Sequence, residues 1–214
     1  SNKRNREVAL QLRSAEAYEW ALAVFDHDWS RGHGPMIHRV LLPLVMRDYA
    51  SPADYPLITE VFVNPKEENE SAHEWVELYN PGPAADIAGW TLGDAINAGD
   101  FGDGRYSFPV GAQLLHDQVI VAAACATNFA AENGRNPDYE WTDCDPQVDD
   151  LISAGAWEGF GLALGNAQDE ALLLRADGSL VDSVAWGGGL RVEVTPFTSF
   201  TNTIPAGFAL KRYP

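Results

Sequence analysis

The chain has 214 residues, enough for one large domain or for one domain and part of another. Hydrophobic residues make up 46% and charged residues 21%, a globular balance that excludes a disordered chain. The longest apolar run, Val40–Met46, is far shorter than the ~20 residues that span a bilayer, so no transmembrane segment is expected. The chain starts at Ser1 without a Met, which is typical of a cut end, and we expect sequence upstream.

The net charge of −17 is divided unevenly along the chain. Residues 1–50 hold seven Lys/Arg and six Asp/Glu, a net charge of +1. Residues 51–214 hold seven Lys/Arg and 25 Asp/Glu, a net charge of −18. The two stretches are therefore expected to belong to different units. Because an acidic surface repels phosphate groups and anionic headgroups, binding of nucleic acid or membranes by the second stretch is disfavoured.

The first 50 residues predict one strand and one helix. Residues 5–12 indicate a short strand, and Ser14 is a candidate N-cap for a helix that reaches about residue 30. Four large apolar side chains recur at helical spacing and share one face: Tyr18, Leu22, Phe25 and Trp29. One strand and one helix cannot bury this face alone. It is expected to pack on the rest of this chain or on a sheet of another domain.

From residue 57 onward the pattern is that of short strands. We place the domain boundary in the linker-like segment 50–53 and the second domain at 56–214. Eight or nine strands with turn signals between them favour a sandwich or barrel. The predicted strands are 57–63, 74–80, 87–92, 106–108, 118–124, 161–164, 170–175, 179–186 and 207–212. Asp177-Gly178 predicts a two-residue hairpin, and the long insertion 127–159 predicts a short helix at 128–132.

The two cysteines, Cys125 and Cys144, leave two interpretations open. They are 19 residues apart and have no CxxC spacing or second pair, so a zinc site is not predicted. They form a disulfide if the compartment is oxidising, or they are one buried strand thiol and one loop thiol. Neither is expected to be a nucleophile, because no His partner lies nearby in the sequence.

Few residues suggest a ligand site. The acidic segment 141–150 offers candidate Ca²⁺ ligands, although it lacks the regular spacing and central Gly of a calcium loop, which favours a merely solvated loop. These candidates are Asp143, Asp145, Asp149 and Asp150. A second acidic group, with the same interpretation, is Asp94, Asp100 and Asp103.

Two other pairs of residues are candidate ligand or catalytic groups. Trp141 and Trp157 are candidate ligand aromatics for a glycan. Glu60 and Glu77 are two carboxylates of the kind a glycosidase uses, but both lie in alternating strands, where Glu is ordinary. No catalytic residue and no cofactor apart from the candidate Ca²⁺ are predicted.

Several ordered motifs in the second stretch resemble the lamin tail domain. They are Ile58–Val61, Glu74–Asn80, Ala88–Leu92, Tyr106–Pro109, Leu164–Asn166, Asp169–Glu170, Val181–Gly187 and Gly207–Arg212. The resemblance covers about residues 56–214. It implies an immunoglobulin-like β-sandwich that is attached to other proteins, generally without catalysis of its own. Animal relatives use the domain as a nuclear interaction surface that includes nucleic-acid contacts, and the charge of −18 argues against that role here.

The first stretch resembles the extreme C-terminus of a phospholipase D-like domain. The resemblance rests on Asn5–Leu10 and on the helix that ends in Val24–Trp29. That family places a similar strand and helix after its second His-x-Lys motif, where His is the nucleophile and Lys binds the phosphate. None of the five His residues in this chain has Lys two positions later. The catalytic part is therefore expected to lie outside this chain.

The expected fold is mainly β: an immunoglobulin-like sandwich of the lamin-tail type, preceded at 1–50 by the strand and helix of a truncated α/β domain. The expected function is a non-catalytic interaction or targeting module at the C-terminus of a secreted phospholipase D-like or nuclease-like hydrolase. The alternative is a carbohydrate- or cell-wall-binding sandwich. An extracellular or cell-surface location follows from the composition and the family context. The sequence leaves the protein or cell-surface partner and the oligomeric state open.

Overall fold

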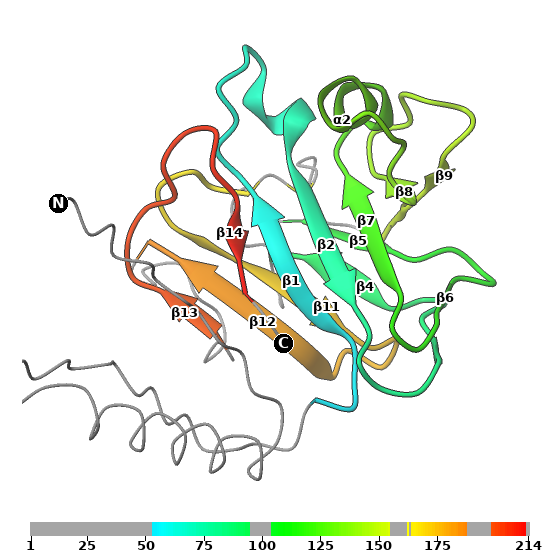
Figure 1. Ribbon diagram of the computed structural model, residues 1–214. Coiled ribbons are helices and arrows are strands. Elements are labelled where there is room, and N and C mark those ends of the chain that lie inside the picture. The colour runs from blue at the N-terminus through cyan, green and yellow to red at the C-terminus, as the bar shows by residue number, and fades with distance from the viewer. Residues whose placement is uncertain (1–52, 95–103, 155–161, 163, 188–197, 213–214) are drawn as a thin grey trace, which may run out of the picture. The chain divides into compact units, whose positions relative to one another are not determined.

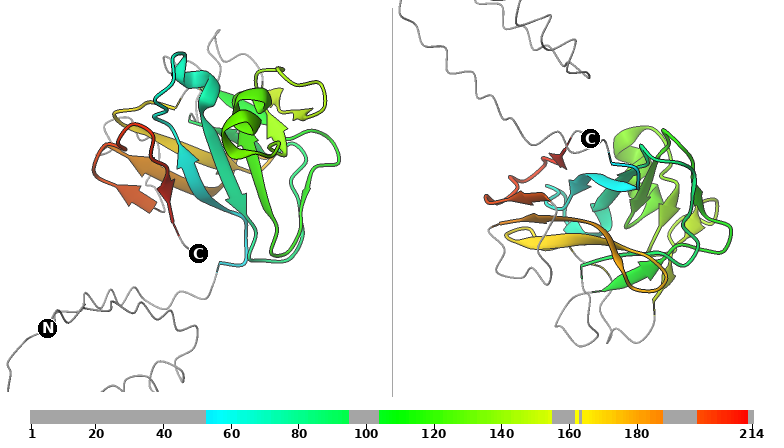
Figure 2. Two further views of the ribbon diagram at one scale, coloured as in Figure 1. Left: turned by 45° about the horizontal axis from the view of Figure 1, so that its top comes forward. Right: turned by 90° about the horizontal axis from the view of Figure 1, so that it is seen from below.

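Two β-sheets packed face to face make up the described part of the chain (Figures 1 and 2). The computed structural model describes residues 53–94, 104–154, 162, 164–187 and 198–212. The chain divides into two units, Ser1–Met46 and Arg47–Pro214, and only the second contains described residues. The strand and helix predicted at 1–50 lie outside them, so that prediction and the predicted domain boundary stay predictions. Among the described residues, no helix is long and apolar enough to cross a membrane.

The first sheet carries six strands in the order β14-β1-β2-β7-β8-β9. Their bounds are β14 Leu210–Lys211, β1 Leu57–Phe62, β2 Trp75–Tyr79, β7 Val119–Ala123, β8 Tyr139–Glu140 and β9 Asp149–Asp150. The pairs β14–β1, β1–β2 and β2–β7 are antiparallel, whereas β7–β8 and β8–β9 are parallel. The pairing of β1 with β2 shifts register between Ile58 and Glu60, a bulge that lets β1 keep both Ile58 and Val61 in the core.

The second sheet has the order β10-β5-β4-β11-β12-β13. Its strands are β10 Ile152–Ser153, β5 Arg105–Ser107, β4 Thr91–Gly93, β11 Asp169–Leu174, β12 Leu180–Trp186 and β13 Thr198–Phe200. All its pairs are antiparallel except β12–β13, which is parallel. A two-stranded ribbon of β3 Ala85–Asp86 and β6 Gln113–Leu114 completes the described strands.

The core lies between the two sheets and is built by alternation along the strands. In β2, for example, Val76 and Leu78 are buried in the core, while Trp75 lies on the outer face. On that outer face a second, smaller cluster joins Trp75 to Val121, Ala123 and Phe129. Phe129 belongs to helix α2, Ala126–Asn133, which therefore covers the outer face of the first sheet (Figure 1). The helix confirms and extends the one predicted at 128–132.

The predicted hairpin between β11 and β12 is confirmed, but its loop is longer than predicted. The Arg175 amide donates to the Ser179 carbonyl at 2.8 Å, and the Gly178 amide donates to the Arg175 carbonyl at 2.8 Å. Three residues therefore form the loop, not two, and Gly178 has a φ of +83°. A three-residue hairpin needs a left-handed residue at its last loop position, which glycine adopts without strain.

The insertion 127–159 does not interrupt the sandwich but supplies strands to both sheets. After α2, the strands β8 and β9 extend the first sheet, and β10 joins the second sheet beside β5. Only Leu151, which is buried, separates β9 from β10. These two-residue strands were not predicted, because so short a segment has no measurable alternation and depends on partners far away in the sequence.

Two other predicted strands differ from the structure. The segment predicted as a strand at 87–92 is a turn through Ile87–Trp90 followed by β4, because Gly89 has a φ of +74° and the Trp90 amide donates to the Ile87 carbonyl at 3.0 Å. For the strand predicted at 161–164, residues 162 and 164 carry no strand and the other two lie outside the described part.

A buried carboxylate joins the two sheets. Asp182 in β12 is fully buried, and its Oδ2 accepts a hydrogen bond of 2.7 Å from the Ile58 amide of β1 in the opposite sheet. The same oxygen pairs with the guanidinium of Arg212, directly after β14. Near the bulge of β1, one acid therefore connects β1, β12 and the end of β14.

We predict that Asp182→Ala lowers the free energy of unfolding by about 3–5 kcal/mol, because it removes the carboxylate that the buried Ile58 amide and the Arg212 guanidinium share. Urea unfolding of both proteins at neutral pH measures the change. Asp54→Ala, which removes an exposed acid, is the matched control. A loss for Asp182→Ala no larger than that of the control would show that the connection is not needed for stability.

Candidate functional site

The end of the first sheet where β1 and β7 finish and β2 begins gathers the acidic and cysteine residues singled out by the sequence. Helix α2, the 3₁₀ helix η1 (Glu70–His73) and the loop 141–150 lie at this end (Figure 1). Glu140, at the end of β8, is fully buried there.

Glu140 organises the loop that follows it. Its Oε2 accepts a hydrogen bond of 2.6 Å from the Ala126 amide at the start of α2. Its Oε1 accepts from the amides of Cys144 at 2.8 Å and Asp145 at 2.7 Å. A carboxylate near a helix N-terminus that takes three amide protons is well satisfied although it is buried. Glu140 therefore holds both ends of the segment 126–145 together.

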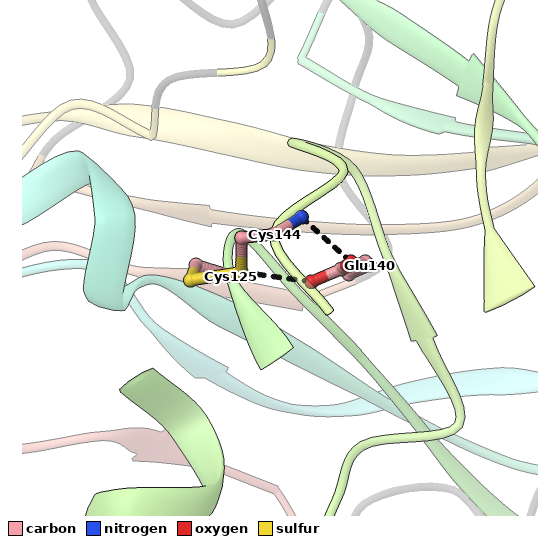
Figure 3. A group of neighbouring side chains, drawn as sticks. All are labelled: Cys125, Glu140 and Cys144. Carbon is pink, nitrogen blue, oxygen red and sulfur yellow. Dashed lines mark hydrogen bonds between the residues drawn. A yellow bond between two sulfur atoms is a disulfide. The ribbon is translucent and has the colours of Figure 1, made fainter. Parts of the chain in front are cut away.

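The two cysteines form a disulfide beside this carboxylate (Figure 3). Cys125 is the N-cap residue of α2, and Cys144 lies in the loop, with the Cα atoms 5.6 Å apart. The Cys144 sulfur is 3.0 Å from Glu140 Oε2, which is a close approach and not a hydrogen bond, since a disulfide sulfur carries no proton. Of the two interpretations that the spacing left open, the structure contains the disulfide.

The structure brings two of the four candidate Ca²⁺ ligands together. Asp143 and Asp150 join Glu140 in a group whose carboxylate oxygens lie within 4.8 Å of one another. The pKa of Asp150 is raised, first by desolvation and then by the like charges of Asp143, Glu140 and Asp149. Asp145 instead accepts a hydrogen bond of 3.0 Å from the Gln147 amide. Since Glu140 already serves three amides, the group has little capacity left for an ion, and Ca²⁺ binding stays a prediction.

The two candidate glycan-binding tryptophans do not form an exposed aromatic surface among the described residues. Trp141 is only 5% exposed and packs in the main core, so its ring offers no face to a glycan. Trp157 lies outside the described residues. Trp75 and Trp90 pack on the sheets: Trp75 stacks on Phe62 at 5.7 Å, and Trp90 lies under the Arg175 guanidinium at 5.5 Å.

Glu60 and Glu77 lie opposite each other on β1 and β2, and Glu77 Oε1 is 3.9 Å from the Lys211 ammonium that also pairs with Glu60. Glu60 pairs with Lys211 at 2.5 Å, and Glu77 accepts a hydrogen bond of 2.9 Å from the Thr59 hydroxyl.

In the second acidic group, Asp94 is buried and accepts a hydrogen bond of 2.6 Å from the Gly104 amide. Asp100 and Asp103 lie outside the described residues.

A groove next to η1 is lined in part by Glu74, a buried carboxyl whose pKa is strongly raised. The groove is lined by Lys66, Glu67, Glu68, Asn69, Glu70, Ser71, Glu74, Leu164, Gly165 and Asn166. Glu74 forms part of its floor, is 3% exposed, and accepts a hydrogen bond of 3.0 Å from the Leu164 amide. The pKa of Glu74 is raised to about 8, chiefly by burial; the hydrogen bond from the Leu164 amide lowers it, and the nearby carboxylates of Asp94, Asp169 and Glu70 contribute to the rise.

Glu74 was not predicted as a site residue, although the sequence contains a signal for it. Alternation in β2 buries Val76 and Leu78, and a period of two puts Glu74 on the same inward side. The same reasoning marks Asp182, which lies two and four residues before the buried Val184 and Trp186. Glu140 offers no such signal, because β8 is too short to show a period.

We predict that Glu74 makes the stability fall as the pH rises. The folded protein keeps this proton when the unfolded chain loses it, so the contribution is fully present below about pH 4.5 and is lost as the pH rises through about 8. Between these limits the slope approaches about 1.4 kcal/mol per pH unit. Urea unfolding from pH 5 to pH 9 is expected to give a flatter profile for Glu74→Gln. The exposed Glu68→Gln is the control, and an unchanged slope in Glu74→Gln would contradict the assignment.

We predict that reduction of the Cys125–Cys144 disulfide lowers the free energy of unfolding by about 3 kcal/mol, because the closed loop spans 19 residues. Thermal unfolding with and without dithiothreitol measures this loss. The double variant Cys125→Ser/Cys144→Ser should start at the lower stability and not respond to the reductant. Alkylation of both cysteines in the denatured, unreduced protein would contradict the pairing.

The comparisons with known proteins agree with the fold and the sequence motifs. No curated protein matches the chain. A family model, the Lamin Tail Domain, matches residues 50–188 and so covers most of the sandwich, from β1 to the end of β12. The chain belongs to the lamin tail domain family.

Proposed function

We propose that the sandwich is an interaction or targeting module at the C-terminus of a secreted phospholipase D-like or nuclease-like hydrolase. The observation that carries this proposal is membership of the lamin tail domain family, whose immunoglobulin-like domain is a non-catalytic binding module. The parent enzyme, its secretion and the partner are parts of the proposal, and each has its own support.

The parent enzyme is supported by sequence alone. Asn5–Leu10 and Val24–Trp29 resemble the last strand and helix of a phospholipase D-like domain. The change of net charge from +1 over residues 1–50 to −18 over residues 51–214 is consistent with two units that differ in origin. In this proposal the upstream unit supplies the catalytic His and Lys residues.

Secretion is supported by the disulfide. Disulfides persist in oxidising compartments and are rare where glutathione and thioredoxin keep thiols reduced. Cys125 and Cys144 pair in the structure, and the described chain contains no free cysteine. An extracellular or cell-surface location accounts for both observations.

The partner is proposed to be a protein or a cell-surface component, not nucleic acid. A net charge of −18 over residues 51–214 repels phosphates, and the groove beside η1 is lined by the exposed Glu67, Glu68 and Glu70. The glycan-binding alternative loses support because Trp141 is buried, and no described observation favours it.

Catalysis by the sandwich itself is not proposed, although Glu74 has a perturbed pKa and lies at a groove. Its carboxyl is buried and hydrogen-bonded to the backbone of Leu164, so its pKa reflects a place in the core. Buried structural carboxyls shift their pKa for the same physical reasons as catalytic ones.

We predict that the natural full-length protein hydrolyses a generic phosphodiester such as bis(p-nitrophenyl) phosphate, and that the 214-residue chain does not. Deleting residues 53–212 from the full-length protein should leave kcat on this small substrate unchanged and abolish retention at the cell surface. Turnover by the 214-residue chain alone would overturn the proposal of a non-catalytic module. Inactivity of the full-length protein would overturn the phospholipase D-like parent but not the binding role.

A further inference from the structure

A histidine and two glutamates from three separate segments converge between η1 and α2. They are His73, the last residue of η1, Glu132 in the last turn of α2, and Glu67 in the loop before η1. One ligand atom from each lies within 4.8 Å of the other two. The Nδ1 atom of His73 contacts Glu132 Oε1 directly, across 59 residues of sequence.

We propose that Glu67, His73 and Glu132 bind a divalent transition-metal ion of the Zn²⁺ class. A tetrahedral ion about 2.0–2.2 Å from each nitrogen or oxygen ligand holds two ligand atoms about 3.3–3.6 Å apart. Side-chain rotation must therefore shorten a separation of up to 4.8 Å by about 1 Å and widen the direct contact between His73 and Glu132. Three protein ligands leave a coordination position for water, which suits a site at a partly exposed edge.

The ligand set distinguishes this group from the acidic group around Glu140. Imidazole nitrogen favours Zn²⁺ and its transition-metal neighbours, whereas Ca²⁺ and Mg²⁺ take oxygen ligands. Glu140, Asp143 and Asp150 offer only oxygens, and the Glu140 oxygens already accept three amide protons. The His73 group has a nitrogen ligand, and its carboxylates accept fewer hydrogen bonds: Glu67 Oε2 accepts one, from the Lys66 amide at 2.8 Å, and Glu132 contacts His73.

The surrounding contacts hold two of the three ligands in place before any ion binds. The Asn128 side chain of α2 donates a hydrogen bond of 3.1 Å to the Ala72 carbonyl of η1, next to His73. Beneath them, Phe129 of α2 packs edge-on against Trp75 at 5.9 Å. The two elements lie side by side (Figure 1). Such preorganisation reduces the ordering cost of binding, and only the loop that carries Glu67 remains to be fixed.

An alternative explanation for the contact between His73 and Glu132 is a simple ion pair. The chain contains a matched example of that alternative. His116 Nε2 lies 3.4 Å from Asp117 Oδ2, and among the described residues no third ligand joins this pair. The converging Glu67 is what distinguishes the His73 group, because a second carboxylate beside the pair adds negative charge that a divalent cation neutralises.

The test is calorimetric titration of the chelator-treated, disulfide-intact chain with Zn²⁺, Ca²⁺ and Mg²⁺ chlorides, together with thermal unfolding at each end point. The expected result is one saturable Zn²⁺ site that raises Tm. The variants His73→Asn and Glu132→Gln should weaken Zn²⁺ binding by about tenfold or more. Glu67→Gln, on an exposed loop where the fold is not at stake, should do the same. His116→Asn and the double variant Asp143→Asn/Asp150→Asn should bind as the parent does.

Three results would overturn the proposal. The first is no saturable Zn²⁺ binding by the folded chain. The second is Zn²⁺ binding that survives in Glu67→Gln and His73→Asn, which would place the ion elsewhere. The third is tighter binding of Ca²⁺ or Mg²⁺ than of Zn²⁺ at these same residues, which would show that the His73 nitrogen does not select the metal. This metal site does not depend on the proposed targeting role, so either proposal can fail without the other.

Discussion

Buried carboxylates hold this sandwich together. Each of Glu74, Asp94, Glu140, Asp169 and Asp182 is almost inaccessible and accepts a hydrogen bond from at least one backbone amide. The amides belong to segments that lack a continuous ladder partner: the bulge of β1, the turns before β5 and β11, and the start of α2. An unsatisfied buried amide costs free energy comparable to a lost hydrogen bond, so these acids replace missing strand partners.

Because of this role, the acidic composition does not describe the protein surface alone. A charge of −18 over residues 51–214 suggests a solvated acidic surface, yet several of those acids are internal and belong to the architecture. Glu74 shows the cost of burying an acid. Desolvation favours its protonated form, and its pKa is raised to about 8. Many of the exposed acids among the described residues lie in η1 and the loop before it, in α2 and in the segment 138–150. That end of the module is therefore the one with a distinctive chemistry.

The sequence predicted the long strands well because their alternation is local. The ranges 57–63, 74–80, 118–124 and 179–186 correspond closely to β1, β2, β7 and β12. The short strands β8, β9, β10 and β13 were missed, because two or three residues pair only after distant segments have been placed.

The same limit applies to the candidate site. The acidic candidates Asp143 and Asp150 were identified, but no sequence pattern shows that Glu140 lies between them and serves three amides. Trp141 looked like a surface ring within an insertion, and it is buried because that insertion is part of both sheets. The convergence of Glu67, His73 and Glu132 depends on how η1 packs on α2, which no periodicity shows.

Leu151, the single buried residue between β9 and β10, affects the sheet edges that the folded module exposes to other copies. Because the chain steps from one sheet to the other through Leu151, both sheets end on that side in two-residue strands of one continuous segment. Edges so short offer few backbone groups to an incoming strand. On the opposite side, β14 is equally short and carries the charged Lys211, a residue that disfavours edge-to-edge pairing. Copies of the module at high local concentration are therefore not expected to pair edge to edge, although the two sheets do not close into a barrel.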